Sequence, residues 1–180
     1  MPKETIKELF FNYPTRQWHF EALLKESKLS RAQTNTWLKK LLHQGLIKRI
    51  KPKGKMPYYI SQFDSAQYLS AKKIFVLEQF HASGFLNHLL SLQQAQAVII
   101  FGSMIRGDWY KESDIDLFVY GKADDLDLGK YWLKLNREIQ FFGCENGQEL
   151  KKFSPALLKN ILSGYTVKGS IPNLEVKAGA

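Results

Sequence analysis

Hydrophobic positions recur with two different periods along the chain. Between residues 4 and 44 they are spaced three and four apart, which predicts three amphipathic helices. Ser30 suits the N-cap of the third helix, and Gly45 is a suitable stop after it. Apolar residues then gather in two short runs, 46–50 and 57–60, which predict two strands joined by a turn.

The second part of the chain mixes helical patterns with continuous apolar runs. Helical spacing covers residues 63–79 and 85–92, whereas 97–101 and 115–120 are unbroken apolar runs that predict buried strands. Residues 137–142 alternate like a further strand. We therefore predict an α/β (α+β) protein, in which a helical N-terminal region precedes a mixed sheet with helices packed mainly on one face.

Composition narrows the class of protein. The 180 residues are 44% hydrophobic, and no apolar run approaches the ~20 residues that span a bilayer. The first residues lack the charged and apolar regions of a secretory signal. The single cysteine, Cys144, excludes an internal disulfide and suits a reducing compartment. We expect a cytoplasmic protein without a membrane partner.

The net positive charge of the chain comes entirely from its first third. Residues 1–63 contain 13 Lys and Arg against 4 Asp and Glu, a net charge of +9, whereas residues 64–180 contain 13 of each. A basic module joined to a neutral one is typical of polyanion binding. We therefore expect a basic domain at 1–63, a linker helix at 64–82 and a second domain at 83–180.

The candidate chemistry lies around the two predicted buried strands. Gly102 and Ser103 follow the first, where glycine lets a ligand approach the backbone and the amides of a following helix attract phosphate. Asp114 and Asp116 are two apart at the second, so their side chains leave the same face. Paired carboxylates suit a hard divalent cation. This pattern predicts a nucleoside triphosphate site with Mg²⁺ or Mn²⁺.

The same residues resemble a known signature. G-S-x-x-R-G at 102–107, followed by S-D-x-D-L at 113–117, is similar to the motif of polymerase-beta-like nucleotidyltransferases, in particular their minimal domains. The resemblance covers roughly residues 84–150 and implies transfer of a nucleoside monophosphate from an NTP to an acceptor. Arg106 either contacts a phosphate or supports the aspartate-bearing strand. The implied roles are phosphate binding for Gly102, Ser103 and Arg106, and metal binding and catalysis for Asp114 and Asp116.

The family has a third carboxylate on a later strand. Here the aligned position is Gln140, which cannot act as a general base, and Glu138, one pleat earlier, is the candidate catalytic replacement. Two interpretations stay open. The protein is an enzyme, or it is a DNA-binding regulator or antitoxin-like protein whose domain binds nucleotide with little or no turnover. The second interpretation includes a small helical toxin as a protein partner.

The basic region also resembles a known fold. Helices followed by a basic hairpin are similar to winged helix-turn-helix domains, with most of the likeness at Leu29–Ile60. The resemblance implies that the third helix enters the major groove and that the hairpin touches the DNA backbone or minor groove. A protein-interaction module with solvated lysines is the alternative. The residues expected to contact double-stranded DNA are Arg31, Gln33, Asn35, Thr36 and Lys39 on the helix, and Lys48, Arg49, Lys51, Lys53 and Lys55 on the hairpin.

Segments outside these motifs give weaker indications. Trp109 or Tyr110, between the two halves of the signature, is a candidate for stacking on a base. Aromatic residues within 63–92 indicate packing between domains or self-association, and a homodimer would suit paired DNA half-sites. The acids of 123–127 are expected to begin a helix and not to bind metal. Residues 164–180 show no assignable pattern.

Overall fold

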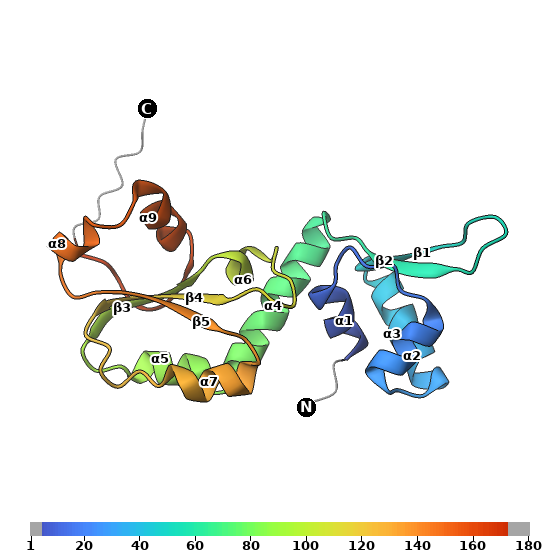
Figure 1. The fold of residues 1–180 in the computed structure, drawn as a ribbon, viewed down its shortest axis with the longest axis horizontal. Helices are drawn as coiled ribbons and strands as arrows, with labels where there is room; N and C mark the ends of the chain where they lie inside the picture. The colour runs from blue at the N-terminus through green and yellow to red at the C-terminus, as the bar shows by residue number, and fades with distance from the viewer. Residues whose placement is uncertain (1–4, 173–180) are drawn as a thin grey trace. The chain divides into compact units, whose positions relative to one another are not determined.

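The computed structural model describes residues 5–172, and the chain divides into two compact units (Figure 1). The first unit contains the residues up to Phe75 together with Gly107–Glu112. The second contains Val76–Arg106 and the residues from Ser113 onward. A short loop from the middle of the predicted motif region therefore packs with the N-terminal residues.

The first unit consists of short helices and a hairpin. Thr5 and Ser30 form capping boxes that begin two of the helices. The two strands of the hairpin are antiparallel. The predicted helices and strands are present; residue 4, where the first helix was expected to begin, lies outside the described residues. The elements are α1 (Ile6–Asn12), α2 (Phe20–Ser27), α3 (Arg31–His43), β1 (Ile47–Ile50), β2 (Tyr58–Ser61) and the first part of α4 (Ala66–Ala82).

Aromatic side chains form the core of this unit. Phe10, Phe11 and Tyr68 are almost completely buried. The rings of Phe11 and Tyr68 meet edge to face with centroids 5.2 Å apart. The hydroxyl of Tyr68 donates a hydrogen bond of 2.6 Å to the carbonyl oxygen of Phe10. These contacts join α1 to the first part of α4, since buried aromatic pairs add attraction beyond their buried area.

The second unit contains a four-stranded sheet and the remaining helices. The strands predicted at 97–101, 115–120 and 137–142 are confirmed with small shifts at their ends. Strand β6 pairs with β3 but was not predicted, because none of its five residues is buried and its sequence lacks an apolar run. The elements are α5 (Phe85–Ser91), β3 (Ala95–Phe101), α6 (Ser103–Arg106), β4 (Ile115–Gly121), α7 (Leu128–Leu135), β5 (Ile139–Cys144), α8 (Gly147–Leu150), α9 (Pro155–Leu162) and β6 (Tyr165–Gly169).

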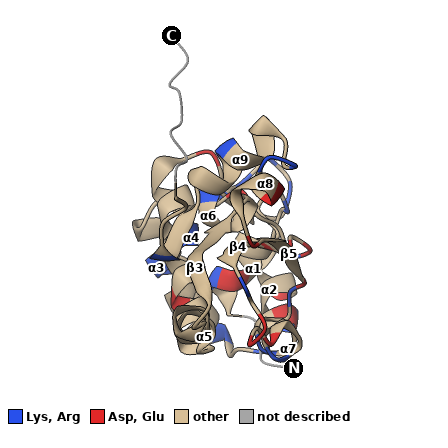
Figure 2. Cartoon of the chain, turned by 90° about the vertical axis from the view of Figure 1, so that its left-hand side faces the viewer, with Lys and Arg blue, Asp and Glu red and all other residues tan. Residues whose placement is uncertain are grey.

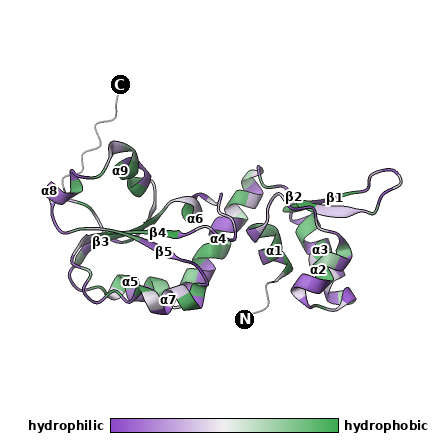
Figure 3. Ribbon diagram, in the orientation of Figure 1, coloured by the Kyte–Doolittle hydropathy of each residue, from purple (hydrophilic) through white to green (hydrophobic). Residues whose placement is uncertain are grey.

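The sheet is mixed, as predicted, with the order β5-β4-β3-β6. Strands β4 and β5 are parallel, and the other two pairs are antiparallel. Helices α5 and α7 cover one face, and α8 and α9 lie over the other (Figure 1), so the expectation of helices mainly on one face was wrong. The reason is that β3 and β4 are apolar on both faces (Figure 3). Both faces therefore need cover.

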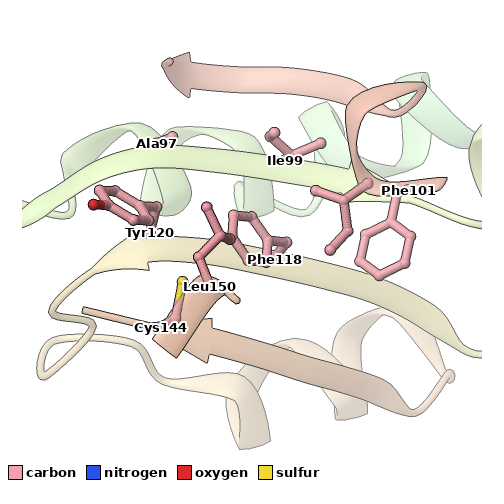
Figure 4. Close-up of a cluster of buried hydrophobic side chains, with 8 residues drawn as sticks. Ala97, Ile99, Phe101, Phe118, Tyr120, Cys144 and Leu150 are labelled. Atoms are coloured by element: carbon pink, nitrogen blue, oxygen red, sulfur yellow. The ribbon is translucent and has the colours of Figure 1, made fainter. Parts of the chain in front are cut away.

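One buried cluster shows how the sheet presents its site (Figure 4). It includes Phe101 from β3, and Phe118 and Tyr120 from β4. Because alternate residues of a strand leave the same face, Asp116 projects to this same side at the end of β4 where the apolar cluster stops.

In the described part of the chain, no helix has the length and hydropathy needed to cross a membrane.

Candidate functional site

Gly102 and Ser103 follow β3 and are called the glycine-serine corner below. Gly102 lies against the side chain of Asp116. Phe101 is the cross-strand partner of Asp116, so Gly102 follows directly beside that carboxylate. A Cβ added to Gly102 would overlap Oδ2 of Asp116 and would lie 2.8 Å from its Cγ. Gly102 also has a φ of 77°, in the left-handed region that favours glycine. Glycine is therefore required both by the backbone and by the space that the carboxylate occupies.

The backbone of the segment that carries Asp114 is held by hydrogen bonds to the two residues before β5. Nη1 of Arg137 donates a hydrogen bond of 2.9 Å to the carbonyl oxygen of Ser113. The amide of Ile115 donates to the carbonyl oxygen of Glu138, also at 2.9 Å. Asp114 lies between these two attachment points, immediately before β4. Its backbone position is therefore fixed relative to the strand that carries Asp116.

The two aspartates interact electrostatically. Burial raises the pKa of the Asp116 carboxyl, and the negative charge of Asp114 raises this pKa further. The positive charge of the Arg106 guanidinium lowers it. Figure 2 colours the charged residues of the chain. Two like charges at short range disfavour the doubly ionised state, and a bound cation relieves that repulsion. Carboxylate oxygens are also the ligands that Mg²⁺ prefers. The donor set fits Mg²⁺ or Mn²⁺.

Arg106 is the last residue of α6, the short helix that begins at Ser103. Its Nη1 donates a hydrogen bond of 3.1 Å to Oδ1 of Asn160 on α9. Its charge also acts on Asp116, so the structure brings Arg106 to the aspartates as well as to the corner. Asn160 was missed by sequence reasoning, because it lies far along the chain and belongs to no motif.

The structure places the two candidates for the third polar group differently. The parallel register pairs Gln140 with Asp116, so both side chains leave the same face of the sheet. Glu138 precedes β5 and lines a cavity of about 220 Å³ together with residues of α7, among them Trp132. Among the described residues, no group of three or more His, Cys, Asp or Glu side chains is arranged to hold a metal. It is therefore Gln140 that lies next to Asp116 across the strands.

A comparison with protein families identifies the surrounding domain. Residues 86–167 match the family model described as polymerase beta, nucleotidyltransferase. This part of the chain is therefore similar to a nucleotidyltransferase domain. It begins within α5, ends within β6 and contains the corner, both aspartates and Gln140. Domains of this family transfer phosphorus-containing groups. A search of curated proteins gave no match to the chain.

The loop between the two halves of the motif corrects one expectation. Trp109 is only 1% exposed and belongs to the core of the first unit, so it is not available to stack on a base. Tyr110, its neighbour, is 54% exposed. The sequence did not reveal this difference, since both aromatic residues occupy the same short polar loop.

The candidate DNA-binding residues lie on the surface of the first unit. Three of those on α3 have partners within the unit. Arg31 forms a 2.8 Å ion pair with Glu21, Gln33 belongs to the capping box of α3, and the Thr36 hydroxyl donates 3.0 Å to the carbonyl oxygen of Ala32. The residues found to be exposed are Arg31, Gln33, Asn35, Thr36 and Lys39 on α3, Lys48 and Arg49 on β1, and Lys51, Lys53 and Lys55 in the following turn.

We expect Gly102→Ala to displace the Asp116 carboxylate and to weaken Mn²⁺ binding by at least tenfold, with a loss of stability of about 3 kcal/mol from backbone strain and overlap together. Gly54→Ala is the matched control. Gly54 has a φ of 71° but no atom within 4 Å of an added Cβ, so its variant should lose only about 1 kcal/mol. Urea unfolding and Mn²⁺ titration measure both effects. Equal losses in the two variants would contradict the role of the overlap.

Proposed function

We propose that the protein is a metal-dependent nucleotidyltransferase that transfers a nucleoside monophosphate from an NTP to a hydroxyl acceptor. The observation that carries this proposal is the Asp116 carboxylate packed against Gly102, with the charge of Asp114 acting on it. The corner proposed to bind phosphate and the pair proposed to bind the cation would thereby be adjacent. This is the arrangement that a triphosphate with its divalent cation requires.

Each residue has a proposed task. Asp114 and Asp116 would hold Mg²⁺, which when bound stabilises negative charge on the phosphoryl group being transferred. Gly102 lets the triphosphate approach the backbone, and Ser103 offers its amide and hydroxyl. Arg106 adds positive charge beside the phosphates while Asn160 restrains its side chain. Orientation of the substrate by these groups is a main source of rate enhancement in phosphoryl transfer.

Two measurements test the proposal. Calorimetric titration with ATP, GTP, CTP and UTP should show binding that requires Mg²⁺ and disappears in Asp114→Ala. Incubation with α-labelled NTPs and candidate acceptors should then give labelled product. Label on nucleic acid would identify a nucleic-acid acceptor, and label on a small helical protein would favour the antitoxin-like interpretation. NTP binding that is independent of both Mg²⁺ and Asp114 would refute the proposed site.

A second candidate function is a DNA-binding regulator whose nucleotidyltransferase domain binds nucleotide without turnover. The observation that favours it is the pairing of Asp116 with Gln140, an amide that cannot take a proton from an acceptor hydroxyl. In this case Mg²⁺-NTP would act as a ligand that stabilises the domain. Saturable NTP binding without label transfer would support this candidate.

Gln140→Asp distinguishes the two candidates further. Because residue 140 lies beside Asp116, a carboxylate there should raise label transfer about a hundredfold if a missing general base limits the reaction. Gln148→Asp is the matched control, since Gln148 is exposed on α8 and should leave transfer unchanged. If Glu138 already serves as the third acid, Gln140→Asp should give no gain and Glu138→Gln should abolish transfer.

We also propose that the basic domain expected at residues 1–63 is a winged helix-turn-helix domain that binds double-stranded DNA. Support comes from helices followed by an antiparallel hairpin, and from exposed cations on β1 and its turn. Asn35 and Lys39 on α3 would face the major groove. The Arg31–Glu21 pair is exposed on both sides, so a phosphate can replace Glu21 at small cost. A homodimer would place two such units on paired half-sites.

A further inference from the structure

The loop Gly107–Glu112 connects the two halves of the nucleotidyltransferase motif but belongs to the N-terminal unit. It follows Arg106, the last residue of α6, and precedes Ser113 and Asp114. A trans peptide unit separates successive Cα atoms by only about 3.8 Å. A loop of fixed conformation therefore limits how far apart its two ends can lie.

Trp109 is the main anchor of the loop. Its side chain is 1% exposed. Its ring stacks on Phe75 with centroids 6.4 Å apart and an interplanar angle of 20°, and it meets Phe11 edge to face at 6.2 Å. Phe75 belongs to α4 and Phe11 to α1. The Trp109 side chain therefore packs against two helices of the N-terminal unit. Burial of so large an aromatic surface resists displacement.

Lys72 provides a second attachment. It lies on α4, is 1% exposed, and its ammonium group is 4.2 Å from the centroid of the Trp109 ring. The same group donates a hydrogen bond to the carbonyl oxygen of Trp109. A buried cation is costly unless it is compensated. Lys72 therefore holds the loop backbone through a hydrogen bond that a side chain without a donor, such as methionine, cannot make.

The backbone of the loop is restrained on both sides of Trp109. A Cβ added to Gly107 would lie 2.8 Å from the carbonyl oxygen of Leu69, so the loop passes directly against α4. The amide of Lys111 donates a hydrogen bond of 3.0 Å to the carbonyl oxygen of Asn12. The loop is thus attached before, at and after Trp109, which leaves little freedom for the residues that follow it.

We propose that Trp109 and Lys72 are positioning residues of the nucleotidyltransferase site. By fixing the conformation of the loop they would restrict the separation of its two ends, and with it the separation of Arg106, which precedes the loop, from Asp114, which follows it. The inference rests on the proposed function and extends it to residues that touch neither cation nor nucleotide. A purely structural role of Trp109 would instead stabilise the N-terminal core alone.

The test uses Mn²⁺ alone as the probe. The concentration of free Mn²⁺ is measured from its electron paramagnetic resonance spectrum, and the affinity follows from a titration. Trp109→Ala and Lys72→Met should each weaken Mn²⁺ binding about tenfold, while the conservative Trp109→Phe should restore most of the affinity. Leu133→Ala is the control, because Leu133 is 82% exposed on α7. Unchanged Mn²⁺ affinity in folded Trp109→Ala would overturn the proposal.

A chain insertion separates positioning from folding. Gly-Ser-Gly inserted between Glu112 and Ser113 leaves the Trp109 contacts intact but slackens the connection. Positioning predicts that the insertion weakens Mn²⁺ binding as Trp109→Ala does, and that combining both changes gives no further loss. If Trp109→Ala does not fold, the insertion alone decides, and wild-type affinity in that variant refutes positioning.

Amide hydrogen exchange tests the anchoring without any metal. Residues 102–106 and 113–116 should exchange about tenfold faster in Trp109→Ala, with the centre of β3 unchanged. Equal exchange at these residues would overturn the proposal whatever the Mn²⁺ result. If the wild-type protein shows no Mn²⁺ binding that depends on Asp114 and Asp116, the proposed function fails, and exchange still decides whether the loop positions these segments.

Discussion

Replacing Asp116 with asparagine should lower nucleotidyl transfer about a thousandfold, because loss of a metal ligand removes several kcal/mol of charge stabilisation and each 1.36 kcal/mol is a factor of ten. The exchange keeps the size of the side chain, so its packing against Gly102 should survive. The rate of label transfer at saturating Mg²⁺-NTP measures the effect. Asp125→Asn is the matched control, since Asp125 is exposed in the loop after β4 and should retain full activity.

The same variant should be slightly more stable than the wild-type protein in metal-free buffer at neutral pH. Folding raises the pKa of Asp116, so its ionisation opposes folding: the cost is absent below the unfolded pKa and develops as pH rises through the folded pKa. We expect Tm to increase at pH 7, and the difference to vanish in acid. Mg²⁺ should stabilise the wild-type protein but not the variant. A Tm that falls at neutral pH would contradict this account of the site.

Binding to double-stranded DNA should weaken about 500-fold between 50 and 200 mM salt, the change expected if the five cations of β1 and its turn each neutralise one phosphate. The slope of log affinity against log salt concentration should then be about −4.5. Fluorescence anisotropy with a labelled duplex measures it. Weak binding that is equal at both salt concentrations would favour the protein-interaction alternative.

Charge removal on the hairpin provides the control for this prediction. Changing Lys51, Lys53 and Lys55 together to glutamine should make the salt slope shallower by about 2.7, since three phosphate contacts are lost. The same change at Lys151, Lys152 and Lys159, which are exposed in the second unit, alters net charge equally and should leave the slope unchanged. Equal effects of the two triple variants would indicate general electrostatic attraction and not a hairpin contact.

Much of the local structure could be predicted from the sequence. The strands that carry Phe101 and Asp116 were predicted from continuous apolar runs. The start of α3 was predicted from Ser30, which is its N-cap. The match of residues 86–167 to the nucleotidyltransferase family model agrees with the likeness predicted from the motif, which combines several residues at fixed spacing. Strand β6 was not, since an edge strand without a buried residue leaves no hydrophobic pattern.

The sequence by itself determined the residue types available for chemistry: a glycine at the end of one buried strand, and two carboxylates two residues apart at the start of the next. It also determined the concentration of positive charge before residue 64. These features are local, since strand alternation, capping and composition depend on neighbouring residues along the chain.

Only the tertiary structure decided which side chains meet. Cross-strand register placed Asp116 against Gly102 on one side and beside Gln140 on the other. Packing also assigned Trp109 to the N-terminal core and removed it from the candidates for base stacking. The physical reason is the same in both cases: contacts between residues distant in sequence depend on strand pairing and on burial of large apolar surfaces, which no local pattern specifies.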